Sequence, residues 1–257
     1  MAGTVVIKWG GGLITHKDKL CTVNDSIIEE LAAACEKSSK KLVIVHGAGS
    51  FGHMKAKQFR LAEGRVAGID QDKAVQDVRN DMLELNRVVV SSLESRGLDV
   101  KSFPPHKWAR GTGPTFSGTL PIHDGITVVY GDVVDDDVNE FGILSGDDLM
   151  LRYATEISDV ERAIFAIGNV DGILRVPPSK AGPEDLIEVW NPEMEFEGEH
   201  AVEIDVTGGI GLKAARGAMI ASKGIDVVLV NGEISQRVID AIEGLPVVGT
   251  RIVSGNC

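Results

Sequence analysis

Short apolar runs, glycine turns and helical segments follow one another along most of this chain. Runs of four to six apolar and β-branched residues are typical of buried strands. Such strands are predicted at Thr4–Trp9, Leu42–Val45, Ile126–Tyr130, Ala163–Ile167 and Asp226–Val230. Glycine turns follow the first four of these runs, at Gly10, Gly47, Gly131 and Gly168. Glycine at a strand end allows a tight turn and lets the backbone approach a ligand closely.

Hydrophobic positions between the strands recur at helical spacing. Asp25–Lys37 carries its apolar residues on one stripe, with Asn24 or Asp25 as the N-cap. Longer or later helices are predicted at Asp72–Arg96, from Ser145 onward, at Leu212–Lys223 and at Ile234–Ile242. The order strand, glycine turn, helix, strand predicts parallel βα units with right-handed crossovers.

Other segments lack a clear period. Pro104–Asp124 is rich in Pro, Gly, Thr and His and is predicted to be a loop. A turn at Asp135–Asp137 followed by a strand at Phe141–Leu144 predicts a hairpin, and Gly249–Val253 predicts a short terminal strand. The polar, proline-bearing stretch Val176–Gly198 indicates a surface excursion or a mobile lid.

Composition narrows the classes of partner. The 257 residues include 26 Lys and Arg against 38 Asp and Glu, a formal net charge of −12. So acidic a surface repels nucleic acid, and any phosphate site needs local positive charge. No apolar stretch is long enough to span a bilayer, so we expect no membrane partner. Cys21, Cys35 and Cys257 have neither metal-ligand spacing nor an even count, which favours a cytoplasmic protein.

Lys8 stands at a strand end beside the turn Gly10–Gly12. A lysine beside N–H-rich backbone either reaches a transferring phosphate or is a surface residue, and this segment alone leaves both open. Lys17 could reach the same phosphates, but Lys17-Asp18-Lys19 is more simply interpreted as a solvated charge run. Neither a Walker loop nor a dinucleotide fingerprint is present in this segment. The missing dinucleotide fingerprint argues against the hypothesis that the protein is a dehydrogenase.

The segment His46–His53 contains glycines at Gly47, Gly49 and Gly52 that let backbone pass close to an anion. His53 is expected where the next helix begins, and its ring could donate to a phosphate oxygen there. A lone histidine is more often packed or solvent-exposed, although the place of His53 after the glycine turn favours a role in phosphate binding. His46 is expected to be structural, closing the strand.

Further on, carboxylates and a lysine lie beside glycine turns. In Ser145-Gly146-Asp147-Asp148 the two acids either cap a helix or, in the case of Asp147, hold catalytic lysines by charge-assisted hydrogen bonds. Asp171 has the same ambiguity, since Val-Asp-Gly is also an ordinary turn. Thr207-Gly208-Gly209 with Lys213 suits a nucleotide polyphosphate.

Together these segments resemble the amino acid kinase superfamily. The set comprises Lys8-x-Gly10-Gly11, His46–His53, Tyr130–Val134, Ser145–Asp148, Val170–Gly172 and Asp205–Gly209 through Lys213, in order along nearly the whole chain. The motifs are weak singly and strong jointly. His53 after Ser-Phe-Gly makes the chain similar to the archaeal-type isopentenyl phosphate kinase family.

The resemblance implies an α/β fold, an αβα sandwich with a largely parallel central sheet. It implies one domain over residues 1–257, with an acceptor-binding and catalytic lobe over about 1–160 and a nucleotide-binding lobe over about 161–257. The implied reaction is phosphoryl transfer from ATP, with Mg²⁺ carried by the nucleotide, to isopentenyl phosphate. A cytoplasmic homodimer is implied as well.

Roles are implied position by position. Lys8, Lys17 and His53 would be catalytic, and Asp147 would be the organising carboxylate. The acceptor would lie against Ala48, Gly49, His53 and Gly146. ATP would contact Lys8, Gly10, Gly11, Gly12, Gly49, Gly168, Asn169, Asp171, Gly209 and Lys213.

Two departures from the family pattern affect the nucleotide side. Gly12 replaces the usual serine, and Gly168-Asn169 replaces a Thr-Asp pair. Another kinase of the superfamily, acting on acetylglutamate, carbamate or fosfomycin, is one alternative, but a carboxylate substrate calls for an arginine clamp. A catalytically silent nucleotide sensor is another, although a sensor has no need of transition-state lysines.

Overall fold

The computed structural model describes residues 3–16, 18–194 and 209–255. Within these ranges, the main sheet has eight strands in the order β3-β4-β2-β1-β7-β9-β10-β8. Their bounds are β1 Thr4–Trp9, β2 Lys41–His46, β3 Val100–Ser102, β4 Ile126–Tyr130, β7 Val160–Ile167, β8 Val189–Trp190, β9 Asp226–Asn231 and β10 Gly249–Ile252. From β3 to β9 the neighbours are parallel, and β10 runs antiparallel to β9. The largely parallel sheet is therefore confirmed.

The helices follow the predicted segments closely. They are α1 Gly11–Ile14, α2 Asp25–Glu36, α3 Gly49–Gln58, α4 Asp72–Glu94, α5 Gly146–Glu156, α7 Ile210–Ala221 and α8 Ser235–Glu243. The predicted hairpin is also present, as β5 Asp132–Asp136 paired with β6 Glu140–Leu144. Short 3₁₀ turns, at Leu61–Glu63, Pro105–Lys107, Pro178–Lys180 and Pro183–Asp185, complete the described elements.

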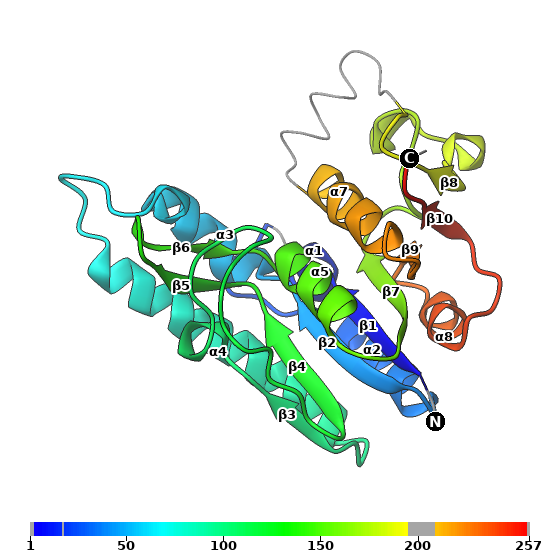
Figure 1. The fold of residues 1–257 in the computed structure, drawn as a ribbon, viewed down its shortest axis with the longest axis horizontal. Helices are drawn as coiled ribbons and strands as arrows, with labels where there is room; N and C mark the ends of the chain where they lie inside the picture. Colours follow the sequence, from blue (N-terminus) through cyan, green and yellow to red (C-terminus); the bar gives the residue numbers. More distant parts are fainter. Residues whose placement is uncertain (1–2, 17, 195–208, 256–257) are drawn as a thin grey trace.

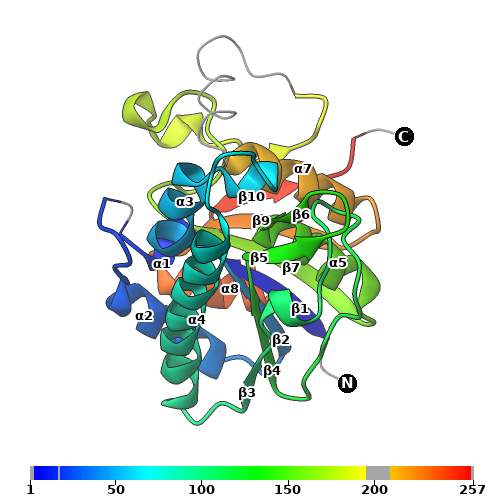
Figure 2. The ribbon, with the colours of Figure 1, turned by 90° about the vertical axis from the view of Figure 1, so that its left-hand side faces the viewer.

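Two hydrophobic cores lie on opposite faces of the sheet. Alternate residues of β1 divide between them, since Val5 and Ile7 pack with α2, α4 and α8, whereas Val6 packs with α5 and α7. This is the period of two that a strand buried on both faces requires. Figures 1 and 2 show the sheet between these helices. The αβα sandwich is confirmed.

The carboxyl ends of the central strands meet at one edge. Register pairing aligns the ends of β1, β2, β4 and β7, with Trp9 beside His46 and Ala166, and His46 beside Tyr130. A glycine follows each of these strands and β9 as well, at Gly10, Gly47, Gly131, Gly168 and Gly232. In open α/β sheets, ligands bind outside the carboxyl ends of the strands.

Several local expectations need correction. Helix α3 begins at Gly49, so His53 lies in its second turn and not at its start. The turn after Lys8 is itself a short helix, because Gly11 and Gly12 open α1. Asn24 is the N-cap of α2 but makes no side-chain capping hydrogen bond. Val176–Gly198 is no simple excursion, since within its described part β8 joins the sheet beside β10.

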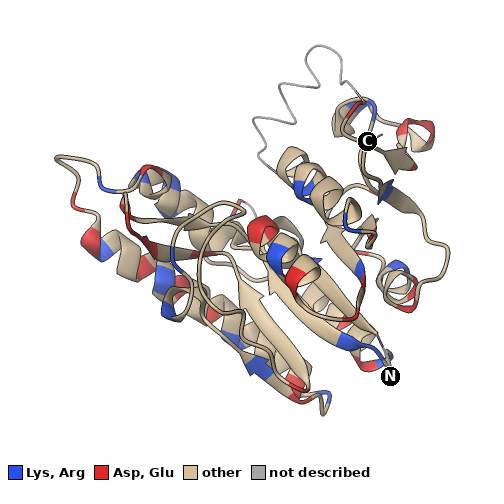
Figure 3. Cartoon of the chain, in the orientation of Figure 1, with Lys and Arg blue, Asp and Glu red and all other residues tan. Residues whose placement is uncertain are grey.

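Charged residues are mostly carried by the outer elements. Figure 3 shows them chiefly on the helices and the β5–β6 hairpin, while the strands are drawn almost entirely in tan. In the described part of the chain, no helix combines the length and the apolar character that crossing a bilayer requires. Because the strands carry few charged residues, a lysine on a central strand is unusual, and Lys8 on β1 is such a residue.

Candidate functional site

The two N-terminal glycine turns pack directly against each other. A Cβ on Gly47 would lie 2.5 Å from Gly11 N, and a Cβ on Gly11 would lie 2.8 Å from Gly49 Cα. Gly49 has φ +50°, a conformation that L side chains rarely adopt. Glycine is needed here because the two backbones touch. The contact brings the starts of α1 and α3 together.

Backbone N–H groups lie at the start of α3, and one of them, Phe51 N, already donates to Ala48 O at 3.1 Å. The first N–H groups of a helix have no partner within it. Thr15 Oγ1 accepts one of them, from Ser50 N at 3.0 Å, and itself donates to Gly11 O. Ala48 is the N-cap of α3 and is half-buried, and His53 is exposed one turn further on. A helix N-terminus of this kind is suited to an anion.

Lys8 and Asp147 form a buried ion pair at the centre of this edge. Lys8 Nζ lies 2.5 Å from Asp147 Oδ1, and the two side chains are 5% and 6% exposed. Lys213 Nζ, from α7, lies 3.7 Å from the other carboxylate oxygen, Oδ2, and donates to Gly209 O at 2.8 Å. One carboxylate therefore sits between two lysines from opposite ends of the chain.

Burial and charge act against each other in this pair. Burial lowers the pKa of the Lys8 ammonium from 10.5 to about 8, although Asp147 opposes the shift. Burial by itself raises the pKa of the Asp147 carboxyl, but Lys8 and Lys213 outweigh it and the net shift is downward. At neutral pH, Asp147 is therefore ionised and Lys8 carries its proton.

The first turn of α5 presents Asp147 without using it as a cap. Ser145 is the N-cap, and its hydroxyl accepts from the N–H groups of Asp147 and Asp148. Gly146 lies so close to Lys8 that a Cβ there would meet Lys8 Cε at 3.2 Å. The capping interpretation of the two acids is thus wrong for this helix, and their carboxylates face cations instead.

Asp148 has a cation of its own. Arg216 Nε on α7 donates to Asp148 Oδ1 at 2.6 Å, and the Asp148 side chain is only 5% exposed. Two consecutive carboxylates on α5 therefore pair with Lys213 and Arg216, which are one turn apart on α7. Arg216 was not among the residues expected at the site, although an arginine three residues after Lys213 is a signal that could have indicated it.

A third turn, Gly168–Asp171, adjoins Gly12 on the side of the C-terminal strands. A Cβ on Gly168 would lie 3.5 Å from Gly12 O. Asn169 has φ +67°, and its N–H donates to Glu233 Oε1 at 3.2 Å. The Asp171 carboxylate is held by Arg237 at 2.5 Å and by Asn231 at 3.1 Å. The contact with Arg237 lowers the pKa of Asp171. Sequence reasoning missed Glu233 and Arg237.

His46 has the structural place that was predicted for it. Its ring is fully buried at the end of β2, stacks on Tyr130 at 4.9 Å and lies 3.3 Å from Asn86 Oδ1. Burial lowers the pKa of His46 to about 4, so the ring is neutral. It closes the strand beside Gly47 and contributes packing.

Most of the predicted site residues meet at this edge. Lys8 and Asp147 join Gly146, Gly209 and Lys213 in one cluster, and the turns at Gly10–Gly12 and Ala48–Gly49 interlock beside it. Asn169 and Asp171 lie on the adjoining turn. Lys17 falls outside the described residues. Positive side chains, helix starts and close glycine backbones together suit a site that binds phosphate groups.

The comparisons with known proteins agree with this geometry. The sequence profile of the Amino acid kinase family matches residues 3–231. The isopentenyl phosphate kinase of Methanothermobacter thermautotrophicus is 29% identical, over 96% of this chain and 98% of that protein. The isopentenyl phosphate kinase of Thermoplasma acidophilum is also 29% identical, over 92% and 95% of the two chains.

Solved structures are similar over almost the full length. An X-ray structure of isopentenyl phosphate kinase superposes with a TM-score of 0.80 at 27% identity, over 97% of this chain and all of that one. UMP kinase from Ureaplasma parvum, at 14% identity and a TM-score of 0.63, shares the fold. The profile match covers most of the sequence, and this chain belongs to the amino acid kinase family.

Proposed function

We propose that this protein transfers the γ-phosphoryl group of ATP to isopentenyl phosphate, giving isopentenyl diphosphate and ADP. The observation that carries the proposal is the buried Lys8–Asp147–Lys213 cluster beside two interlocked glycine turns. Phosphoryl transfer depends on positioning and charge neutralisation more than on covalent catalysis. The relatives named above, which are isopentenyl phosphate kinases, support this acceptor.

The acceptor would bind at the start of α3. Backbone at Ala48, Gly49 and Gly146 would hold its phosphate, and His53 would donate a hydrogen bond to it. Lys8 would bridge the phosphoryl group in transfer, and Lys17 would stabilise its developing charge. Their positive charge offsets the repulsion that a protein of net charge −12 would otherwise exert on two phosphorylated substrates.

ATP would bind toward the C-terminal strands. Contacts would come from the turns Gly10–Gly12 and Gly168–Asp171 and from Gly209 and Lys213. All of these except Gly10–Gly12 would lie in a nucleotide-binding lobe over about 161–257, and the acceptor-binding and catalytic lobe would span about 1–160. The described residues include no group of three or more His, Cys, Asp or Glu side chains able to hold a metal. Mg²⁺ would arrive as part of the MgATP substrate, bound to its phosphates.

An ADP-release assay with several acceptors tests the proposal. We expect turnover with isopentenyl phosphate, slower or comparable turnover with dimethylallyl phosphate, and none with acetylglutamate, carbamate or fosfomycin. Product identity is checked by ³¹P NMR, since a diphosphate has a phosphorus signal that a monophosphate lacks. Turnover of acetylglutamate, carbamate or fosfomycin in place of isopentenyl phosphate would assign the chain to another kinase of the family.

Replacing His53 by alanine is expected to raise KM for isopentenyl phosphate and lower kcat. The loss of one charge-assisted hydrogen bond to phosphate corresponds to about a tenfold or greater fall in kcat/KM. His53→Gln, which keeps a donor, should retain more activity. Gln58→Ala, exposed at the end of the same helix, is the matched control. Wild-type kinetics in His53→Ala would remove His53 from the acceptor site.

The kcat/KM for ATP is expected to fall as pH rises through about 8. This ratio reports ionisations of the free enzyme, and the Lys8 pKa is about 8. Above this value Lys8 loses its charge, so each further pH unit should cost about tenfold. Because Asp147 raises the Lys8 pKa, Asp147→Asn should move the inflection to lower pH. A profile that stays flat up to about pH 10 would contradict the role of Lys8.

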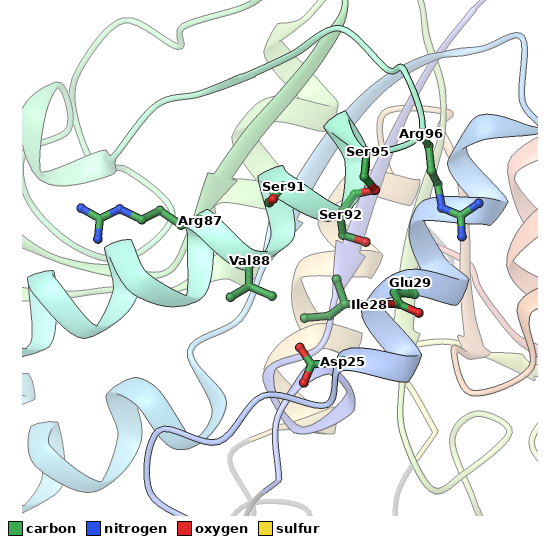
Figure 4. A pocket seen from close by; sticks show the side chains of 9 residues that line it. All are labelled: Asp25, Ile28, Glu29, Arg87, Val88, Ser91, Ser92, Ser95 and Arg96. Atoms are coloured by element: carbon green, nitrogen blue, oxygen red, sulfur yellow. The ribbon is translucent and has the colours of Figure 1, made fainter.

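We also propose that two copies of the chain associate through α2 and α4. An open groove of about 800 Å³ lies between these helices (Figure 4). Asp25 and Glu29 line it from α2, Arg87 lines it from α4, and Arg96 lines it from the segment just after α4. A two-fold axis here would place the acids of one copy opposite the arginines of the other.

A cytoplasmic location is proposed as well, since Cys21 and Cys35 are both free.

A further inference from the structure

A second ion pair lies beside the lysine cluster and has no part in the proposed chemistry. Arg216 Nε lies 2.6 Å from Asp148 Oδ1, with side-chain exposures of 18% and 5%. Nη1 also lies 3.8 Å from Met219 Sδ, a weak contact with an exposed side chain. The ion pair with Asp148 is therefore the main contact that orients Arg216.

The geometry of the two helices makes this pair a neighbour of Lys213. Helix α7 packs on α5, and Lys213 and Arg216 are three residues apart on one face of α7. Asp147 and Asp148 are consecutive on α5. The contact of Lys213 with Asp147 is long, at 3.7 Å, whereas that of Arg216 with Asp148 is short. Of these two ion pairs, the short one therefore constrains the relative position of the helices more strongly.

We propose that Arg216 and Asp148 form a positioning pair that holds α7 in the register where Lys213 meets Asp147 and the nucleotide phosphates. The inference deepens the proposed function and rests on its nucleotide site. Arg216 touches neither substrate and acts through Lys213. Displacements of about 1 Å at a phosphate-binding lysine are enough to cost large factors in binding or rate.

The first experiment compares Arg216→Gln with the wild type. We expect KM for ATP and the dissociation constant of ADP to rise by about tenfold, while KM for isopentenyl phosphate stays within about twofold. ADP affinity is measured by calorimetry without any acceptor. If the chain failed to phosphorylate isopentenyl phosphate, the proposed function would fail while this test still stood. Unchanged ADP affinity in Arg216→Gln would overturn the positioning role.

A matched control separates positioning from a general loss of stability. Arg162 and Asp226 form a similar pair at 2.6 Å, with exposures of 19% and 25%, at the far end of β7 and β9. Arg162→Gln should lower the melting temperature and leave KM for ATP within about twofold of wild type. An equal loss of ADP affinity in both variants would also overturn the proposal.

A mutant cycle tests whether Arg216 acts through Lys213. In a Lys213→Gln background, Arg216→Gln should change ADP affinity by less than about twofold, because the group it positions is gone. Fully additive effects would contradict the proposal. Should Arg216→Gln fail to fold, Arg216→Lys serves instead. It keeps the charge and should weaken ADP binding by about threefold, with the same dependence on Lys213.

Discussion

Replacing Lys8 by methionine is expected to lower kcat by about 10²- to 10³-fold, the loss usual when one preorganised donor to a developing oxyanion is removed. Lys8 is 4% exposed and is held on β1, a central strand of the sheet. In the proposed mechanism its charge would meet the phosphoryl group at a buried position, where little water screens it. The measurement is single-turnover phosphoryl transfer with saturating MgATP and isopentenyl phosphate.

The same substitution should also destabilise the fold, which calls for a control. Without Lys8, the longer contact with Lys213 is the one ion pair that the described residues leave to the buried Asp147 carboxylate, and a buried charge that loses its partner costs about 3 kcal/mol or more. Lys8→Met with Asp147→Asn removes that charge and should recover most of the lost unfolding free energy. If the double variant recovered activity as well, Lys8 would have only a structural role.

Replacing Gly49 by alanine is expected to be nearly as damaging, through the backbone. The added Cβ would overlap Gly11 O and Thr15 Oγ1, at a residue with φ +50°. The two glycine turns would have to separate. This would displace the backbone at Ala48 and Gly49, where the acceptor phosphate is proposed to bind. We expect kcat/KM for isopentenyl phosphate to fall by about 10²-fold, as for a displacement of about 1 Å at a reacting group.

Gly97→Ala is the matched control for this variant. Gly97 also has positive φ, at +75°, but no heavy atom lies within 4 Å of the place that an alanine Cβ would take. Its substitution should cost about 1–2 kcal/mol of unfolding free energy from backbone strain alone and should leave kinetics unchanged. Similar kinetic losses in both variants would show that strain, and not the contact between the turns, causes the effect of Gly49→Ala.

Most of the fold could be predicted from the sequence because the hydrophobic periods and the glycine turns indicate the same strands and helices. Ile126–Tyr130 is both the predicted strand and the observed β4, and Asp72–Arg96 differs from α4 by two residues at one end. The predictions were wrong where contacts with distant residues decide whether an element forms or where it begins. The two-residue strand β8 exists only because β10 lies beside it, and α3 begins at Gly49 because Gly49 packs on Gly11.

The βα order, the glycine turns after the strands and the candidate residues Lys8, Asp147 and Lys213 could all be read from the amino-acid sequence. Glycine, lysine and acid at strand and helix ends are local features, and their chemistry does not depend on distant residues. The folded chain was needed to show that Lys8 is buried, that Asp147 lies between it and Lys213, and that Arg216 pairs with Asp148. These contacts join residues far apart in the chain, 68 positions in the case of Asp148 and Arg216. Such pairings follow from the packing of helices on the sheet, which no local pattern encodes.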